Sequence, residues 1–145
     1  MDTSAATDFF AAVKRNDMQA VERLLAVSPE LIRAADPESE GMTGLHHAAH
    51  FGHVELTARL IGGGADLNAI ESFRQATPLH WAVFDAQLGP AELLLKAGAR
   101  TDLKDSGGDT PRDLAVKGKA GKWVCFSSAK PEAYGPMIEL LESNS

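Results

Sequence analysis

The chain has 145 residues, of which 44% are hydrophobic and 23% are charged, and its formal net charge is −6 at pH 7. This length fits a single domain with its own core, spanning residues 1–145. The acidic balance argues against nucleic acid as a partner, because nonspecific binding to it needs clustered Lys and Arg. No run of about 20 apolar residues indicates a membrane helix.

The N-terminus and the cysteine content bear on the cellular compartment. Asp2 and Asp8 are acidic, and no basic region precedes an apolar stretch, so we expect no secretory signal and a cytoplasmic protein. Cys125 is the only cysteine, which excludes an intramolecular disulfide and agrees with a reducing compartment. We interpret Cys125 as a small apolar residue rather than a reactive thiol.

Four helix pairs are expected in chain order, at about residues 5–38, 39–71, 72–105 and 106–145. Thr43, Thr77 and Thr110 precede the first helix of the last three pairs, the latter two followed by Pro, as is typical of helix starts. Apolar residues return at helical spacing in the second helices. They are Met18, Val21, Leu24, Leu25, then Val54, Leu56, Leu60, Ile61, then Leu88, Leu93, Leu94 and Leu95.

Glycines are expected to end these helices. Gly52 follows one first helix, whereas Gly62-Gly63-Gly64 and Gly98 follow second helices, where a left-handed residue can close the helix. Small residues stand where paired helices need close approach: Ala48, Ala49, Ala82 and Ala115. One such pair cannot bury its apolar stripe alone, so the pairs are expected to stack.

Two markers repeat in one register. Thr43-Gly44-Leu45-His46-His47-Ala48-Ala49 returns at Thr77 and, degraded, at Thr110, after 34 and 33 residues, and Gly64-Ala65-Asp66 returns 34 residues later at Gly98. The pattern resembles the ankyrin-repeat family, with its period of about 33 and its T-P-L-H-x-A motif. The resemblance implies an all-α solenoid of stacked helix-turn-helix units with short β-hairpin-like loops, in which the outer repeats are degenerate caps.

The resemblance also implies a function and a surface. The family's binding groove is lined by the hairpin tips and by the outer face of each first helix. We therefore predict a non-catalytic adaptor or inhibitor, monomeric by itself, that binds a protein partner of unknown identity. The candidate contact residues are Met42, His50, Phe51, Ile70, Ser72, Phe73, Arg74, Phe84, Asp85, Lys104, Ser106, Asp109 and Lys117.

Aromatic residues single out the middle of this surface. Phe51, Phe73 and Phe84 stand at positions where stacking does not require an aromatic, and Arg74 and Asp85 would set polarity, so we expect the binding energy to concentrate there. Trp81 is compatible with either packing or binding. An alternative function is an accessory subunit that stabilises a larger assembly.

A metal site is the other alternative, because His46, His50 and His53 recur at i, i+4 and i+7 beside His47. The resemblance gives His46, His80 and His53 structural hydrogen bonds instead, which leaves His47 and His50 as surface residues. We expect no metal and no cofactor. Residues 118–122 lack the Ser or Thr that a phosphate loop needs, and no catalytic constellation emerges from the spacing of the ionisable residues.

The fourth unit contains an insertion near residues 121–136, before the apolar run that starts at Met137. Two explanations remain open. The insertion either covers the end of the stack, which would bury Trp123, Val124 and Phe126, or it contacts a partner, as long loops in compact domains often do.

Overall fold

The computed structural model describes residues 3–122, 127 and 129–144. Helices come in pairs along the chain, each pair joined by a tight turn except the last. The first helices are α1 (Thr3–Lys14), α3 (Gly44–Phe51), α5 (Pro78–Phe84) and α7 (Pro111–Lys119). The second helices are α2 (Met18–Val27), α4 (Val54–Gly62), α6 (Leu88–Lys96) and α8 (Tyr134–Ser143). Two short 3₁₀ helices, η1 (Pro29–Arg33) and η2 (Pro131–Ala133), complete the helical part.

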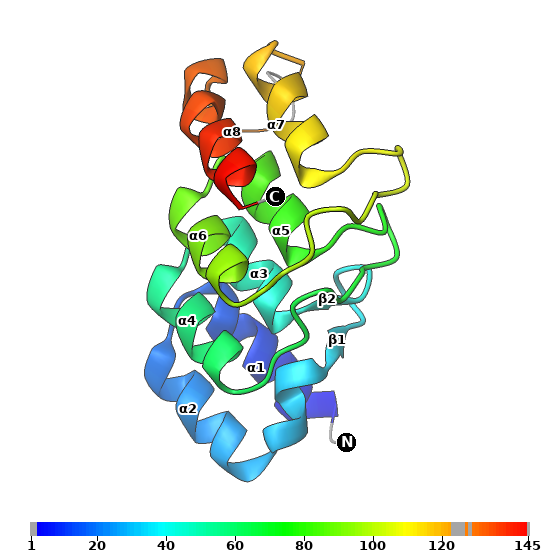
Figure 1. Ribbon diagram of the computed structural model, residues 1–145. Helices are drawn as coiled ribbons and strands as arrows, with labels where there is room; N and C mark the ends of the chain where they lie inside the picture. Colours follow the sequence, from blue (N-terminus) through cyan, green and yellow to red (C-terminus); the bar gives the residue numbers. More distant parts are fainter. Residues whose placement is uncertain (1–2, 123–126, 128, 145) are drawn as a thin grey trace.

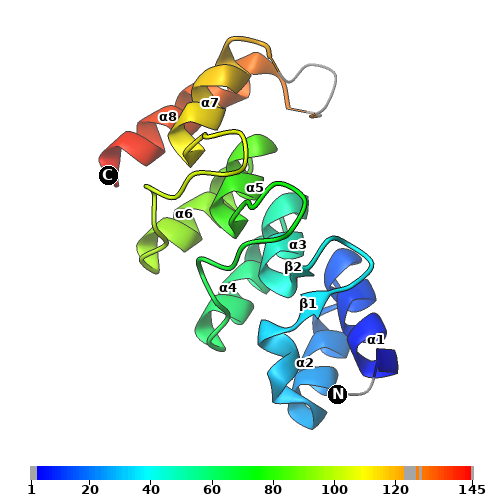
Figure 2. The same ribbon diagram turned by 90° about the vertical axis from the view of Figure 1, so that its right-hand side faces the viewer.

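The pairs stack in sequence order. The first helices form one row, in which α1 packs on α3, α3 on α5 and α5 on α7, and in the second row α4 packs on α6. Figure 1 shows the stack rising from the blue N-terminal pair to the C-terminal pair, in which α7 is yellow and α8 is orange to red, with the connecting hairpins projecting on one side. Figure 2 shows the same order from the side. The expected helical solenoid is confirmed.

Regular strand pairing is confined to one hairpin within the described ranges. Strands β1 (Ala35–Asp36) and β2 (Met42–Thr43) pair antiparallel, with Ala35 opposite Thr43. The later hairpins keep a similar course without assigned strands (Figure 1). This agrees with the predicted short hairpin-like loops.

The predicted helix starts and ends are confirmed. The hydroxyl groups of Thr43, Thr77 and Thr110 each accept the backbone N–H three residues later, and the side chain of that third residue bonds back to the Thr N–H. Each Thr thus satisfies backbone groups that the helix leaves without partners. Gly52, with φ of +76°, ends α3 in the left-handed conformation that glycine adopts without strain.

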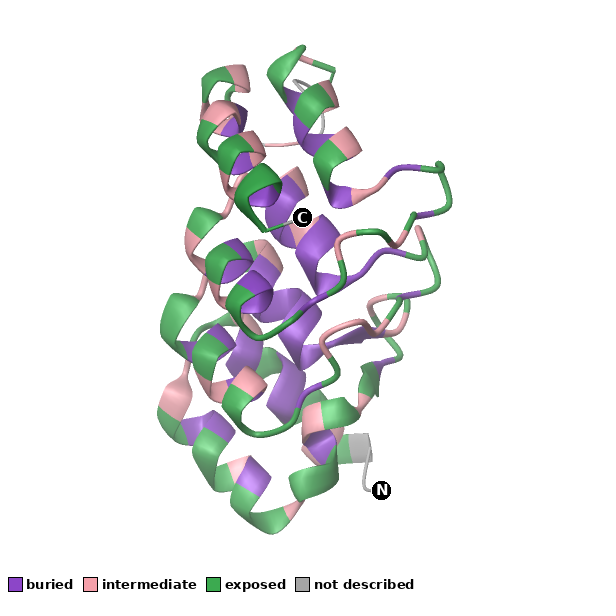
Figure 3. Ribbon diagram, viewed as in Figure 1, coloured by how far each residue is buried: buried purple, intermediate pink, exposed green. Residues whose placement is uncertain are grey.

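The core lies between the two rows of helices (Figure 3). Leu56, Leu60 and Leu94 are fully buried, and so are the small residues Ala48, Ala49, Ala82 and Ala115, as predicted. Val54 and Leu88 differ, because each is the first residue of its helix and remains exposed. The side chain of Val54 lies over Gly89, where a Cβ would be 2.6 Å from Val54 Cγ2.

The two helices of the fourth pair, α7 and α8, lie on either side of the insertion and pack together. Helix α8 packs on α7 and α6, and the ring of Tyr134 occupies the space beside Gly118, where a Cβ would lie 2.6 Å from that ring. The Tyr134 and Ser127 hydroxyls both donate to the Phe84 carbonyl at the end of α5. Trp123, Val124, Cys125 and Phe126 lie outside the described residues, so the two explanations for the insertion stay open there.

Candidate functional site: the hairpin face and its hollow

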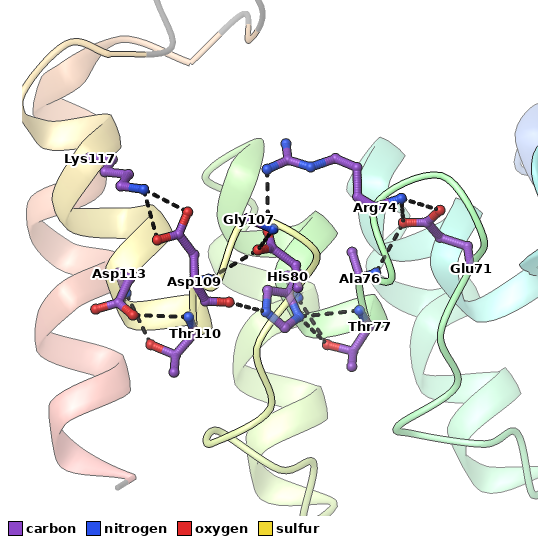
Figure 4. Close-up of polar contacts among 11 residues, drawn as sticks. Glu71, Arg74, Ala76, Thr77, His80, Gly107, Asp109, Thr110, Asp113 and Lys117 are labelled. Carbon is purple, nitrogen blue, oxygen red and sulfur yellow. Dashed lines mark hydrogen bonds and ion pairs between the residues drawn. The ribbon is translucent and has the colours of Figure 1, made fainter.

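Two histidines connect consecutive repeats beneath the hairpins. His46 Nδ1 accepts the Thr43 backbone N–H at 3.0 Å, and its Nε2–H donates to the Ala76 carbonyl of the next hairpin at 2.9 Å. His80 repeats the arrangement with Thr77 and with the Asp109 carbonyl at 2.9 Å (Figure 4). The structural role that the resemblance implied for these histidines is confirmed.

Burial and hydrogen bonding keep these rings neutral. Desolvation lowers the pKa of His46 and that of His80, although the carbonyl bonds oppose the shift. A proton added to Nδ1 would also face a backbone N–H that can only donate. The pair therefore holds the hairpins in place only in its neutral form.

His47, expected at the surface, is buried. Its Nε2–H donates to Asp36 Oδ2 at 3.0 Å, and desolvation lowers its pKa to about 4. Burial raises the pKa of Asp36, but bonds from the Glu38 N–H, His47 and Ser39 outweigh burial and lower it overall. His47 follows His46 on a helix that is covered by α1, which the motif alone does not reveal.

His53 bridges the first two repeats, as the resemblance implied. Its Nε2 bonds the Lys14 carbonyl at the end of α1 at 3.0 Å. The four neighbouring histidines thus face different partners, and within the described part of the chain no group of three or more His, Cys, Asp or Glu side chains is arranged to hold a metal.

Buried carboxylates shape the hairpins, a feature that the sequence analysis missed. Glu71 accepts the backbone N–H groups of Phe73, Arg74 and Ala76, so one carboxylate holds a whole turn. Asp105 does the same for the next hairpin, through Gly107 and Asp109, both at 3.0 Å.

These carboxylates had a detectable signal in the sequence. Asp36, Glu71 and Asp105 recur at spacings of 35 and 34 residues, close to the repeat period. An acidic residue at that period indicates a structural position rather than a solvated face.

Backbone bonds join the hairpins to one another. The Ser72 N–H donates to the Glu40 carbonyl at 2.7 Å, and the Ser106 N–H donates to the Arg74 carbonyl at 2.7 Å. Because each hairpin is fixed to the next one, side chains at the tips have defined positions relative to the first helices.

A hollow of about 580 Å³ opens on this face, between α3, α5 and two hairpins. Its walls are mainly apolar and aromatic, with charged groups at the edge. The lining residues are His50, Phe73, Arg74, Trp81, Phe84, Asp85 and Ser106. Except for Trp81, all of them were among the predicted contact residues, so the structure brings that part of the prediction together.

Ring contacts and ion pairs fix the shape of the hollow. Trp81 packs edge-on against His50 and Phe84, with ring centroids 5.1 and 6.0 Å apart. The Arg74 guanidinium lies 5.7 Å from the centre of the Phe84 ring, while His50 bonds Asp85 across the repeats. The Trp81 indole N–H is buried and has no acceptor within the described residues.

Phe73 lines the hollow but also extends from it, with 68% of its surface exposed. Other predicted contact residues lie outside the hollow but remain accessible. Phe51 is 46% exposed and stacks on the His53 ring. Ile70, Ser72 and Lys104 are exposed along the hairpins.

Two predictions of exposure are wrong. Met42 is buried, because β2 pairs with β1 instead of forming a tip. Asp109 is also buried: its backbone carbonyl accepts His80, and its carboxylate accepts both bonds from Lys117 Nζ, at 2.7 and 2.8 Å. Lys117 itself is half-exposed. Figure 4 shows its two bonds to the Asp109 carboxylate.

The fold and this face define a helical repeat protein built from stacked helix-hairpin units. Residues 9–120 match the family model of ankyrin repeats, in three copies. The chain therefore belongs to the ankyrin-repeat family, whose repeats are typically non-catalytic and suited to protein interaction.

Several curated proteins are similar to the chain over part of their length. Protein PhlB from Serratia liquefaciens is 36% identical over 110 residues, which cover 70% of this chain and 48% of PhlB. Human palmitoyltransferase ZDHHC13 is 37% identical over 65 residues, 45% of this chain and 10% of the relative. Mouse ARF GTPase-activating protein GIT2 is 33% identical over 109 residues, which cover 75% of this chain and 15% of GIT2. The chain thus spans from about a tenth to about half of the length of these relatives.

No helix among the described residues has the length and apolar character that crossing a bilayer requires.

Proposed function

We propose that the chain is a non-catalytic adaptor or inhibitor that binds a protein partner across the hairpin face, with the hollow as the centre of the interface. All four helix pairs, over residues 1–145, act as one ankyrin domain, monomeric without its partner. The single cysteine fits a reducing compartment such as the cytoplasm.

The observation that carries the proposal is the set of aromatic side chains around the hollow. Phe73 is 68% exposed and Phe84 and Trp81 are half-buried, although the core is already filled by Leu, Val and Ala. Aromatic and Arg side chains in partly enclosed pockets are the usual anchors of protein interfaces. Their frame is rigid, because hairpins, histidines and carboxylates are mutually bonded, so little ordering is required when a partner binds.

Affinity capture with matched variants tests this function. Immobilised wild-type protein, Phe84→Ala and Phe73→Ala are compared on extract from the source cells, and bound proteins are quantified by mass spectrometry. Val27→Ala is the control, since Val27 is an 81% exposed apolar residue on α2, away from the hollow.

A partner that is retained by the wild type and the control but lost from both aromatic variants is the expected result. Equal recovery of every bound protein on all four chains would contradict the proposal, provided that circular dichroism gives each variant the wild-type melting temperature.

A further inference from the structure

Ion pairs on the hairpin face differ from the remaining ion pairs in which partner is exposed. In each of them the cation is the exposed partner and the carboxylate is the buried one. The pairs are Lys14–Asp36, Arg74–Asp105 and Lys117–Asp109.

The difference in exposure is large. Lys117 is 39% exposed against 11% for Asp109, and Arg74 is 25% exposed against 0% for Asp105. On the rest of the surface the partners are exposed to similar extents, as with Arg112 at 51% and Glu142 at 52%. In Figure 4, Lys117 and Arg74 both lie above the row formed by Thr110, His80 and Thr77.

The carboxylates are buried for a structural reason. Asp36 and Asp105 hold hairpin backbone N–H groups, so they must lie inside the hairpin, and the cation then covers them from the solvent side. The face therefore presents ammonium and guanidinium groups outward, although the chain as a whole carries a net charge of −6.

We propose, as a deepening of the function above, that the partner segment is an acidic peptide stretch in which Asp or Glu flanks a bulky apolar residue. The apolar residue enters the hollow between Phe73 and Phe84. The acidic side chains accept hydrogen bonds from Arg74, which lines the hollow, and from Lys117 on α7.

Protein is favoured over nucleic acid by the way these charges are arranged. Each cation is paired with a carboxylate, so the field of the pair falls off faster with distance than that of a single charge. Salt screens what remains beyond about 8 Å, so the attraction acts at short range. Polyanions are drawn by summed net charge, which this face does not offer. A carboxylate placed against the exposed cation gains a charge-assisted hydrogen bond in a partly desolvated setting.

Selection from a displayed library of random peptides about 12 residues long, with the intact protein as bait, tests the chemistry of the segment. Enriched peptides are expected to combine Asp or Glu with Trp, Phe, Leu or Met. The strongest peptide is then synthesised together with its Glu→Gln, Asp→Asn counterpart, and both are measured by calorimetry, alongside a single-stranded DNA oligonucleotide.

A double variant separates local polarity from net charge. Lys117→Gln with Asp109→Asn removes one pair without altering net charge, and the backbone bonds of Asp109 are retained. The acidic peptide is expected to bind this variant about tenfold or more weakly. Arg100→Gln with Asp102→Asn is the control, because both partners of that pair are exposed, at 57% and 68%, and no loss is expected.

Three results would overturn the acidic assignment: enrichment of basic or uncharged peptides, equal affinity of the two synthetic peptides, or tighter binding of the oligonucleotide. If such peptides still depend on Phe84, the hollow remains the binding site and only its partner chemistry is wrong. If no enriched peptide depends on Phe84, the proposed function fails as well.

Discussion

Acid is expected to unfold this chain through its buried histidines. The pKa of His47 is about 4 in the folded chain, against an ordinary value of 6.5. Between pH 6.5 and pH 4, His47 therefore binds a proton in the unfolded chain but not in the folded chain. Its neutral form therefore contributes stability that is present above pH 6.5 and is lost as the pH falls towards 4. From this shift, His47 alone removes about 3 kcal/mol by pH 4.

Two further groups act in the same direction. The pKa values of His46 and His80 are also lowered by burial, and protonation of Nδ1 would break the bonds that begin α3 and α5. Asp36 adds to the loss only at lower pH, because its folded pKa lies below its ordinary value, so its contribution disappears as it becomes protonated.

Urea unfolding between pH 7 and pH 4.5 measures the effect. If the unfolded chain binds one proton more than the folded chain, the free energy of unfolding changes by about 1.4 kcal/mol per pH unit. Because several buried histidines contribute, we expect a steeper slope than this for the wild type. His47→Gln keeps a donor for Asp36 without a titrating ring, so its slope should be shallower by about one proton. A wild-type free energy of unfolding that does not vary over this range would show that the buried histidines do not bind protons on unfolding. An unchanged slope in His47→Gln would show the same for His47.

Four substitutions test separate parts of the fold by thermal and urea unfolding. Ala86→Gly should stabilise the chain by about 0.5–1 kcal/mol, because Ala86 has a φ of +54° that glycine adopts without strain; a loss of stability would contradict this. Gly118→Ala should destabilise it by about 1–3 kcal/mol through the clash with the Tyr134 ring, and an unchanged melting temperature would show that the ring moves freely. Leu94→Ala should lose about 2–5 kcal/mol, whereas Phe73→Ala should be nearly neutral; equal losses would make Phe73 a core residue.

The repeat register was readable from the sequence because local rules determine it. Thr43, Thr77 and Thr110 cap helices wherever the motif occurs, and Gly52 closes a helix by its own backbone freedom. The histidines of the motif were readable for the same reason, since each bonds a backbone carbonyl of the following repeat.

Burial on the hairpin face was harder to predict, because it depends on what lies above each residue. Met42 is covered through strand pairing, His47 through α1 and Asp109 through Lys117. The periodic acidic residues at 36, 71 and 105 would have indicated where the hairpins turn. The hollow itself depends on how the side chains of neighbouring repeats pack together, which spacing alone does not give.

Hydrogen–deuterium exchange of the chain with and without its captured partner shows whether the partner binds over the hollow. Slower exchange on binding is expected at the hairpin around Phe73, at the end of α5 around Phe84 and at the hairpin around Ser106, which together surround the hollow. Protection confined to the second helices α2, α4 and α6, with exchange around the hollow unchanged, would contradict this expectation.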